Sequence, residues 1–168
     1  DQAALAPDNS YPLTIDGSSN TSGVAIAVAP GANKTATLQN VIIQNTGGNG
    51  ITVSNGVLKI GAGVTVKNAG TALKRHDGLT ISGGTVHGNV PACAPTSFLN
   101  NTQHGISVTG TGSLNITATP VTLPAPNGQG SVVVSGNAIT GVRIFEGPGG
   151  PQSTINGLVA WNNQQAGL

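Results

Sequence analysis

The sequence predicts an all-β fold, a right-handed parallel β-helix (β-solenoid) of about five coils, each of roughly 27 residues with loop insertions. The main observation is a four-residue unit: Gly, then an aliphatic residue, any residue, and Ile or Val. It begins at Gly23, Gly50, Gly78, Gly105 and Gly141. A second observation is that the 168 residues include only one Trp, one Tyr and two Phe. Stacked aliphatic side chains fill a narrow β-helix core, whereas an ordinary globular core uses more large aromatic residues.

Each coil is predicted to contain three short strands. In the first, the Gly-led unit, alternation places the second and fourth residues inward and the residue between them outward. The second strand is weaker, and is marked by Leu38 with Val41, by 58–60, by 114–116, and by Ile155 with Leu158. The third ends on an asparagine, as in 41–45, 64–68, 133–137 and 158–162, and Phe98-Leu99-Asn100 fits the same place.

The asparagines that end the third strands are predicted to form a structural ladder of Asn45, Asn68, Asn100, Asn137 and Asn162. Counting back by twos from three of them meets aliphatic residues, so these side chains are expected to point inward or into a corner. Stacked asparagine amides bond to one another, and Asn tolerates the left-handed backbone of a sharp corner. The alternative is that Asn is simply a common turn residue, and the doublets at 100–101 and 162–163 leave the register open.

Three stretches interrupt the period, at 91–95, 119–128 and 145–151, and each contains proline. Proline cannot donate to a strand ladder, so these stretches are expected to leave the sheet as surface loops. Residues 1–22 form an N-terminal segment that is predicted to be irregular, with one strand at most, and to serve as a cap or docking strand. Residues 23–168 form the predicted β-helix domain.

The pattern of an Asn-ended strand, a short corner and a Gly-led strand resembles two groups of proteins. One is the right-handed parallel β-helix of the pectate-lyase-like superfamily. The other is the bacterial surface β-helix repeat proteins, whose Phe-x-x-Asn and Gly-Gly-x-Ile repeats resemble 98–101 and 47–51. The resemblance covers residues 23–168 and implies the fold. That superfamily includes lyases, hydrolases, adhesins and viral fibres, so the resemblance does not fix the function.

Composition limits the classes of partner. Six Lys and Arg against five Asp and Glu give a formal net charge of +1, so there is no electrostatic reason to expect nucleic acid or an anionic membrane as a partner. No apolar run approaches the roughly 20 residues of a membrane span. The chain is rich in Gly, Thr, Ser and Asn and has no Met. The chain is therefore expected to be either processed or a fragment, and its composition favours an extracellular or cell-surface protein.

One charged cluster, Lys74-Arg75-His76-Asp77, lies in the corner before Gly78. The resemblance implies a use for it, because polysaccharide lyases and hydrolases of this fold handle acidic sugars with basic residues and carboxylates, and Asp77 with His76 suits proton transfer. The cluster is therefore the candidate ligand-facing loop. The alternative is a solvated loop tip that keeps a nearly neutral surface soluble.

Catalysis is not expected. A glycoside hydrolase needs two facing carboxylates, a calcium site needs several clustered oxygen ligands, and the acidic residues of this chain are few and scattered. His76, His87 and His104 lack the spacing of metal ligands, so neither a metal nor another cofactor is expected. Cys93 lies in a loop with Pro91 and Pro95 and is expected to be a passive thiol, with crosslinking as the alternative.

A minor alternative is an ice-binding face. The predicted outward residues of the Gly-led strands are Ala25, Thr52, Thr80, Ser107 and Arg143, so three consecutive coils present a hydroxyl. Arg143 breaks the row, and short hydroxyl rows also occur on any solvated β-face.

The ends of the predicted β-helix lack a convincing cap, and open ends expose core and strand edges. Two explanations follow: the chain is cut from a longer β-helix, or its open end is completed by the N-terminal segment of a neighbouring copy. We expect a secreted or cell-surface structural or adhesive β-solenoid, which as an extracellular fibre subunit would assemble head to tail with copies of itself. The alternative is a polysaccharide-binding or polysaccharide-degrading module whose partner is a surface polysaccharide.

Overall fold

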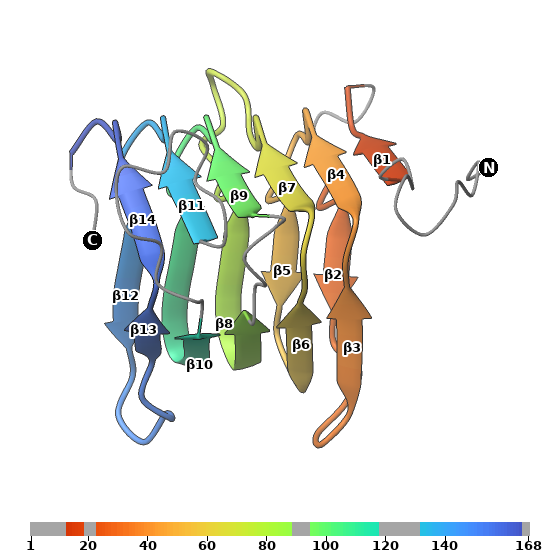
Figure 1. Cartoon of the computed structure of the whole chain (residues 1–168), viewed down its shortest axis with the longest axis vertical. Coiled ribbons are helices and arrows are strands. Elements are labelled where there is room, and N and C mark those ends of the chain that lie inside the picture. The colour runs from red at the N-terminus through yellow and green to blue at the C-terminus, as the bar shows by residue number, and fades with distance from the viewer. Residues whose placement is uncertain (1–12, 19–22, 89–94, 118–131, 166–168) are drawn as a thin grey trace.

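A computed structural model of the chain describes residues 13–18, 23–88, 95–117 and 132–165. Within these residues the regular elements are all β-strands, arranged in two sheets. Figure 1 shows strands from neighbouring repeats lying side by side along the molecule, with β1 near one end and β14 at the other. Every pairing between these strands is parallel. The predicted all-β class is therefore confirmed.

The first sheet has the order β1–β4–β7–β9–β11–β14, so it collects one strand from each repeat. These strands correspond to the predicted third strand, preceded by β1 from the N-terminal segment. Their bounds are β1 Leu13–Asp16, β4 Val41–Gln44, β7 Val64–Lys67, β9 Thr96–Leu99, β11 Val132–Ser135 and β14 Leu158–Trp161.

The second sheet has two limbs that share the long strands β8 and β10. The first limb runs β2–β5–β8–β10–β12, and the second limb runs β3–β6–β8–β10–β13. The bounds are β2 Ile26–Val28, β3 Thr35–Leu38, β5 Ile51–Val53, β6 Val57–Ile60, β8 Leu79–Gly88, β10 Ile106–Thr117, β12 Val142–Glu146 and β13 Thr154–Asn156.

The core lies between the sheets and consists of aliphatic columns that follow the strand register. In the first sheet, Ile43 pairs with Val66, Val66 with Phe98, and Phe98 with Val134, and all four are buried. In the first limb, Ile51, Leu79 and Ile106 form a similar buried column. The strand patterns alternate between buried and less buried residues, as expected when every second residue faces a core.

Two predictions about strands are wrong in detail. The predicted first and second strands merge in β8 and β10, because the chain bends at glycines with positive φ, Gly84 and Gly110, and keeps pairing across the bend. In the second predicted strand, Val41 does not accompany Leu38, because β3 ends at Leu38 and Val41 begins β4 in the other sheet.

The first Gly-led unit is also displaced by two residues. Ile26 pairs with Ile51, so Ala25 and not Gly23 occupies the place of Gly50. Val24, predicted to face inward, is exposed. The motif Gly23-Val24-Ala25-Ile26 predicted the wrong register because the overlapping segment Ala25-Ile26-Ala27-Val28 has the same alternation of larger aliphatic residues.

Of the predicted loops, 91–95 and 119–128 lie almost wholly outside the described residues. The third is a loop only in part, because Phe145 and Glu146 belong to β12 and the turn follows at Gly147–Gly150, closed by a hydrogen bond from Gly150 N to Gly147 O (3.3 Å).

Candidate functional site

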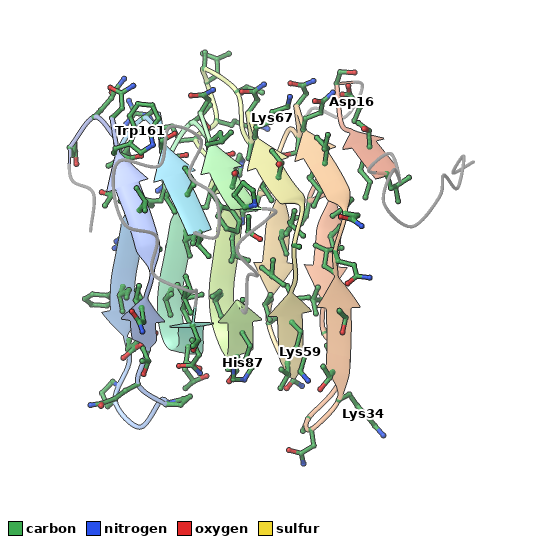
Figure 2. All side chains as sticks on the ribbon, in the orientation of Figure 1. Asp16, Lys34, Lys59, Lys67, His87 and Trp161 are labelled. Carbon is green, nitrogen blue, oxygen red and sulfur yellow. The ribbon has the colours of Figure 1, made fainter. Side chains whose placement is uncertain are left out.

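A groove lies on the outward side of the second limb. Its volume is about 530 Å³, and it is lined by Thr37, Lys59, Ile60, Gly61, His87, Gly88, Asn115 and Thr117. The strand register explains the gathering, because Thr37 pairs with Lys59, Lys59 with His87, and His87 with Asn115. Figure 2 shows Lys59 and His87 next to each other along one edge of the molecule.

The lining of the groove is suited to a ligand that accepts hydrogen bonds. Lys59 supplies an exposed cation, His87 is exposed beside it, and Asn115 and the threonines add neutral donors and acceptors. The described lining residues include no carboxylate. This arrangement favours an anionic or hydroxyl-rich ligand over a cationic one.

Lys59 and His87 were not among the sequence-predicted site residues. The available signal was weak. Lys59 occupies the outward position of a predicted second strand, but no second strand was predicted around His87, and the two residues are adjacent only because β6 and β8 pair in that register. The second strand of the Gly78 coil could not be aligned until the bend within β8 was known.

The sequence-predicted ligand loop is instead a small hairpin. Gly70 and Arg75 form an antiparallel bridge, and Thr71 and Lys74 exchange backbone hydrogen bonds of 2.8 and 3.2 Å. Leu73 lies in the turn and is 97% exposed. Lys74 and Arg75 are exposed, in agreement with a solvated or ligand-facing tip.

His76 and Asp77 do not belong to that exposed tip. His76 N donates to Thr102 Oγ1 (3.0 Å), and its Nδ1 lies 3.3 Å from Asn49 Oδ1. Asp77 is only 8% exposed, and its carboxylate accepts hydrogen bonds from His104 N (3.1 Å) and Thr80 Oγ1 (3.0 Å). The predicted ligand-facing role of Asp77 is therefore wrong, because its carboxylate is buried, with Oδ1 bonded to the next repeat and Oδ2 bonded to Thr80 of its own repeat.

These contacts form a side-chain column at the corner before the Gly-led strands. Asn49 Oδ1 accepts from Asp77 N (3.0 Å), and Asp77 Oδ1 accepts in turn from His104 N. His104 is buried, and its Nδ1 has no hydrogen-bond partner. Burial lowers the pKa of His104, the Asp77 charge opposes this, and Arg143 adds to the lowering.

The predicted asparagine ladder consists of two columns, not one. The outer column occupies the corner after each first-sheet strand and has left-handed backbone at Asn45, Asn68, Asn100, Gly136 and Asn162. Asn68 Nδ2 donates to Asn45 Oδ1 (3.1 Å), and Asn45 Nδ2 donates to Asp16 Oδ1 (3.2 Å). Asn68, Asn100 and Asn162 are exposed, so of the two orientations that the sequence allowed, inward or into a corner, the structure gives the corner. The left-handed turn displaces them from the strand alternation.

The inner column lies one residue later and contains Asn101, Asn137 and Asn163. Asn101 Nδ2 donates to Asn137 Oδ1, and Asn137 Nδ2 donates to Asn163 Oδ1, both at 2.9 Å. Asn101 and Asn137 are buried. Asn137 was therefore assigned to the wrong column, because Gly136 takes the left-handed place in that coil.

The hydroxyl row of the alternative ice-binding face begins at Ala27, because Ala27 pairs with Thr52. Thr52 Oγ1 accepts a hydrogen bond from Asn49 Nδ2 (3.4 Å), and Thr80 Oγ1 donates to Asp77 Oδ2 (3.0 Å). Ser107 is only 2% exposed. The row is therefore engaged in corner contacts and partly covered, which does not favour an open water-ordering face.

Other features of the described residues give no further site. They contain no group of three or more His, Cys, Asp or Glu side chains able to hold a metal ion. Cys93 lies outside them. In the same part of the chain, no helix is long and apolar enough to cross a membrane. Glu146 Oε1 accepts a hydrogen bond from Ser153 N (2.8 Å).

None of the protein families, curated proteins or solved structures compared with this chain matches it.

Proposed function

We propose that the chain is a right-handed parallel β-solenoid with a structural or adhesive role outside the cell, and that copies of it associate end to end. The proposal on fold is supported by the regular parallel register, in which the first sheet and each limb of the second sheet receive one strand, or one part of a long strand, per repeat. Connections between parallel strands of one sheet are right-handed in nearly all proteins, which supports the handedness.

The end-to-end association is argued from the terminal strands. Among the described residues, β1 and β14 are the edges of the first sheet, and β12 and β13 are edges of the second. Leu13 and Ile144 lie in register with the buried Val41 and Val108, yet they are 41% and 40% exposed. Unpaired strand edges beside exposed apolar residues are templates for pairing with another chain.

Sedimentation velocity across a concentration series tests this proposal. The wild-type chain is expected to form growing oligomers, because one end pairs with the opposite end of the next copy. Ile144→Lys places a charge at the edge of the core and is expected to reduce the oligomers strongly. Thr65→Lys, on the outward side of β7 within the first sheet, is the matched control and should assemble like wild type. Equal behaviour of both variants and wild type would contradict the proposal.

A second candidate is polysaccharide binding, which the groove over Lys59, His87 and Asn115 favours. Parallel strands about 4.8 Å apart repeat polar side chains along the axis, and such a row suits an extended acidic or hydroxylated chain. The candidate assigns binding and no catalysis, because the described carboxylates Asp16, Asp77 and Glu146 accept hydrogen bonds within the fold.

Titration calorimetry with an acidic polysaccharide such as polygalacturonate tests the second candidate. Lys59→Ala is expected to weaken binding by roughly tenfold, because it removes the cation of the groove. Lys67→Ala removes an equal charge from the first sheet and should leave the affinity within about twofold of wild type. The double variant Lys74→Ala/Arg75→Ala tests the hairpin separately. If the double variant weakens binding and Lys59→Ala does not, the binding site is the hairpin and not the groove.

A further inference from the structure

We infer that the turn between β5 and β6 is a site of spontaneous covalent modification, in which Asn55 deamidates through a cyclic imide formed with Gly56. The observation is a hydrogen bond from Gly56 N to Asn55 Oδ1 (2.8 Å). This contact brings the backbone nitrogen of Gly56 next to the side-chain amide of the preceding residue. Asn55 is exposed, so water and hydroxide reach the amide.

The chemistry needs only water. Hydroxide removes the proton of Gly56 N, and this nitrogen attacks Asn55 Cγ to close a five-membered ring. The bond from Cγ to Nδ2 breaks, and Nδ2 leaves as ammonia after taking a proton from water. Water then opens the imide at Cγ to give aspartate, or at the main-chain carbonyl to give isoaspartate. The hydrogen bond holds the reacting groups close together before reaction, which lowers the entropic barrier.

Gly56 is suited to this role because its nitrogen is outside the strand ladder. Its φ of 73° belongs to the left-handed region, and a Cβ there would lie 2.7 Å from Gly31 O and 3.0 Å from Lys34 O. The turn therefore requires glycine at this position. Gly56 O accepts from Thr85 N (2.9 Å), so the coil is anchored while the side of the turn that carries Asn55 faces solvent.

Asn49–Gly50 is a matched pair that the fold protects. Gly50 and Gly56 are both buried, but Gly50 N donates to Asp77 O (3.1 Å) in the neighbouring repeat. Asn49 Oδ1 accepts from Asp77 N (3.0 Å). Both partners of the reaction are thus tied into the corner column, so cyclisation there requires local opening. In each pair the residue after glycine is β-branched, Ile51 or Val57.

Asn156–Gly157 is a third pair in the described residues. Asn156 is exposed and Gly157 has a φ of 80°, as in the Asn55 turn. The contact between the asparagine oxygen and the following nitrogen is present at Asn55 and not at Asn156 in this part of the chain. Asn156 is therefore expected to react more slowly than Asn55.

The modification adds a negative charge where the turn packs against Pro30, Gly31 and Lys34. The isoaspartate product also inserts a methylene group into the main chain between two strands that pair in register with their neighbours.

Peptide mapping by mass spectrometry tests the inference. The folded full-length chain is incubated in mildly alkaline buffer, and fragmentation of the tryptic peptide 35–59 locates the mass increase of about 1 Da at either asparagine. We expect Asn55 to convert at least about tenfold faster than Asn49 in the folded chain, because Gly56 N lies next to the Asn55 side-chain amide, whereas Gly50 N is bonded to Asp77 O. In urea the two rates should agree within about twofold, because the local sequences are alike. Asn55→Gln should remove the rapid conversion, since ring closure is slower for the longer side chain.

Similar rates at Asn49 and Asn55 in the folded chain would overturn the inference. So would a folded-chain rate at Asn55 well below its rate in urea, because the turn would then protect the site. Isoaspartate-specific methyl labelling of the same samples gives a second readout that does not depend on the mass change.

Discussion

Asn137 has a dense set of side-chain hydrogen bonds at the centre of the inner column. Its Oδ1 accepts from Asn101 N (3.0 Å) and Asn101 Nδ2 (2.9 Å), while its Nδ2 donates to Phe98 O (3.2 Å) and Asn163 Oδ1 (2.9 Å). Because the residue is fully buried, its loss leaves several polar groups unpaired away from water.

We expect Asn137→Ala to lower the free energy of unfolding by about 3 kcal/mol, measured by urea denaturation. Asn162→Gly is the control. Asn162 is exposed with a φ of 53°, a conformation that glycine adopts freely, so its change should stay within about 0.5 kcal/mol. Equal losses for the two variants would show that burial in the inner column is not what stabilises the corner.

His104 makes stability depend on pH. Its folded-state pKa is lowered below 6.5, mainly by burial, so near pH 6.5 the unfolded chain binds more protons than the folded chain. The contribution of His104 to the free energy of unfolding is therefore fully present above about pH 6.5, and it is lost as the pH falls from there to the lowered pKa.

Urea denaturation at a series of pH values between about 5 and 8 measures this slope. His104→Gln, which does not titrate, is expected to flatten it. If the free energy of unfolding of His104→Gln changes with pH as steeply as that of the wild type, the pH dependence comes from other groups. The lowered pKa of Asp16, caused first by the hydrogen bond from Gln44, acts in a different window, because that stability is lost only as the pH falls below about 3.8.

For individual residues, the sequence predicted that asparagines stack, but it did not predict which column each asparagine joins. It predicted stacked asparagines, yet one residue separates the exposed outer column from the buried inner column. The doublets 100–101 and 162–163 contribute one Asn to each column, and Gly136-Asn137 contributes only to the inner one. A residue with left-handed backbone at the corner interrupts the inward and outward alternation of side chains. Several residue types can adopt this conformation, so the sequence alone does not locate the interruption.

The Gly-led strands begin where two coils approach closely. A Cβ on Gly105 would lie 2.8 Å from Gly141 O and 2.8 Å from Asn137 Nδ2, and would also contact Val134. A carbonyl of the next coil cannot move without disturbing the ladder, because Ile106 N donates to it. The recurring glycine is therefore a consequence of coil spacing and not of turn flexibility.

Gly105→Ala is accordingly expected to lower the free energy of unfolding by roughly 2–4 kcal/mol, measured by thermal or urea unfolding. Gly88→Ala in β8 is the matched control, because a Cβ there would meet Ile116 Cγ1 at an ordinary 3.5 Å. That variant should be neutral or slightly stabilising. A mild effect at Gly105 would contradict the close approach of the two repeats as the reason for the glycine.

Among the elements, the strands of the first sheet were predicted well and those of the second sheet less well. Short aliphatic runs such as 64–66 alternate clearly and end at a corner residue. At the bend inside β8 and β10 the register shifts after Val108, and pairing resumes with Gly83-Gly84 opposite Thr111-Gly112. These segments have the composition of a turn in the sequence. Pairing with neighbours decides that these glycines remain within a strand.

In the whole molecule, the parallel register places side chains from equivalent positions of successive repeats next to one another. Because equivalent positions stack, outward Lys59, His87 and Asn115 make a groove although each is isolated in the sequence. The groove could not be predicted without the register. The apolar residues on the outermost described strands, by contrast, were predictable, because inward residues follow the strand alternation in those strands too.

End-to-end association of stacked coils is tested most directly by electron microscopy of the purified full-length chain over a concentration series, with fibre diffraction of the same samples. The expected result is fibres of uniform width, one solenoid wide, that lengthen with concentration and show a spacing of about 4.8 Å along their axis. Single particles of constant mass at every concentration would contradict end-to-end association. Fibres without the axial spacing would contradict the stacking of coils along the fibre.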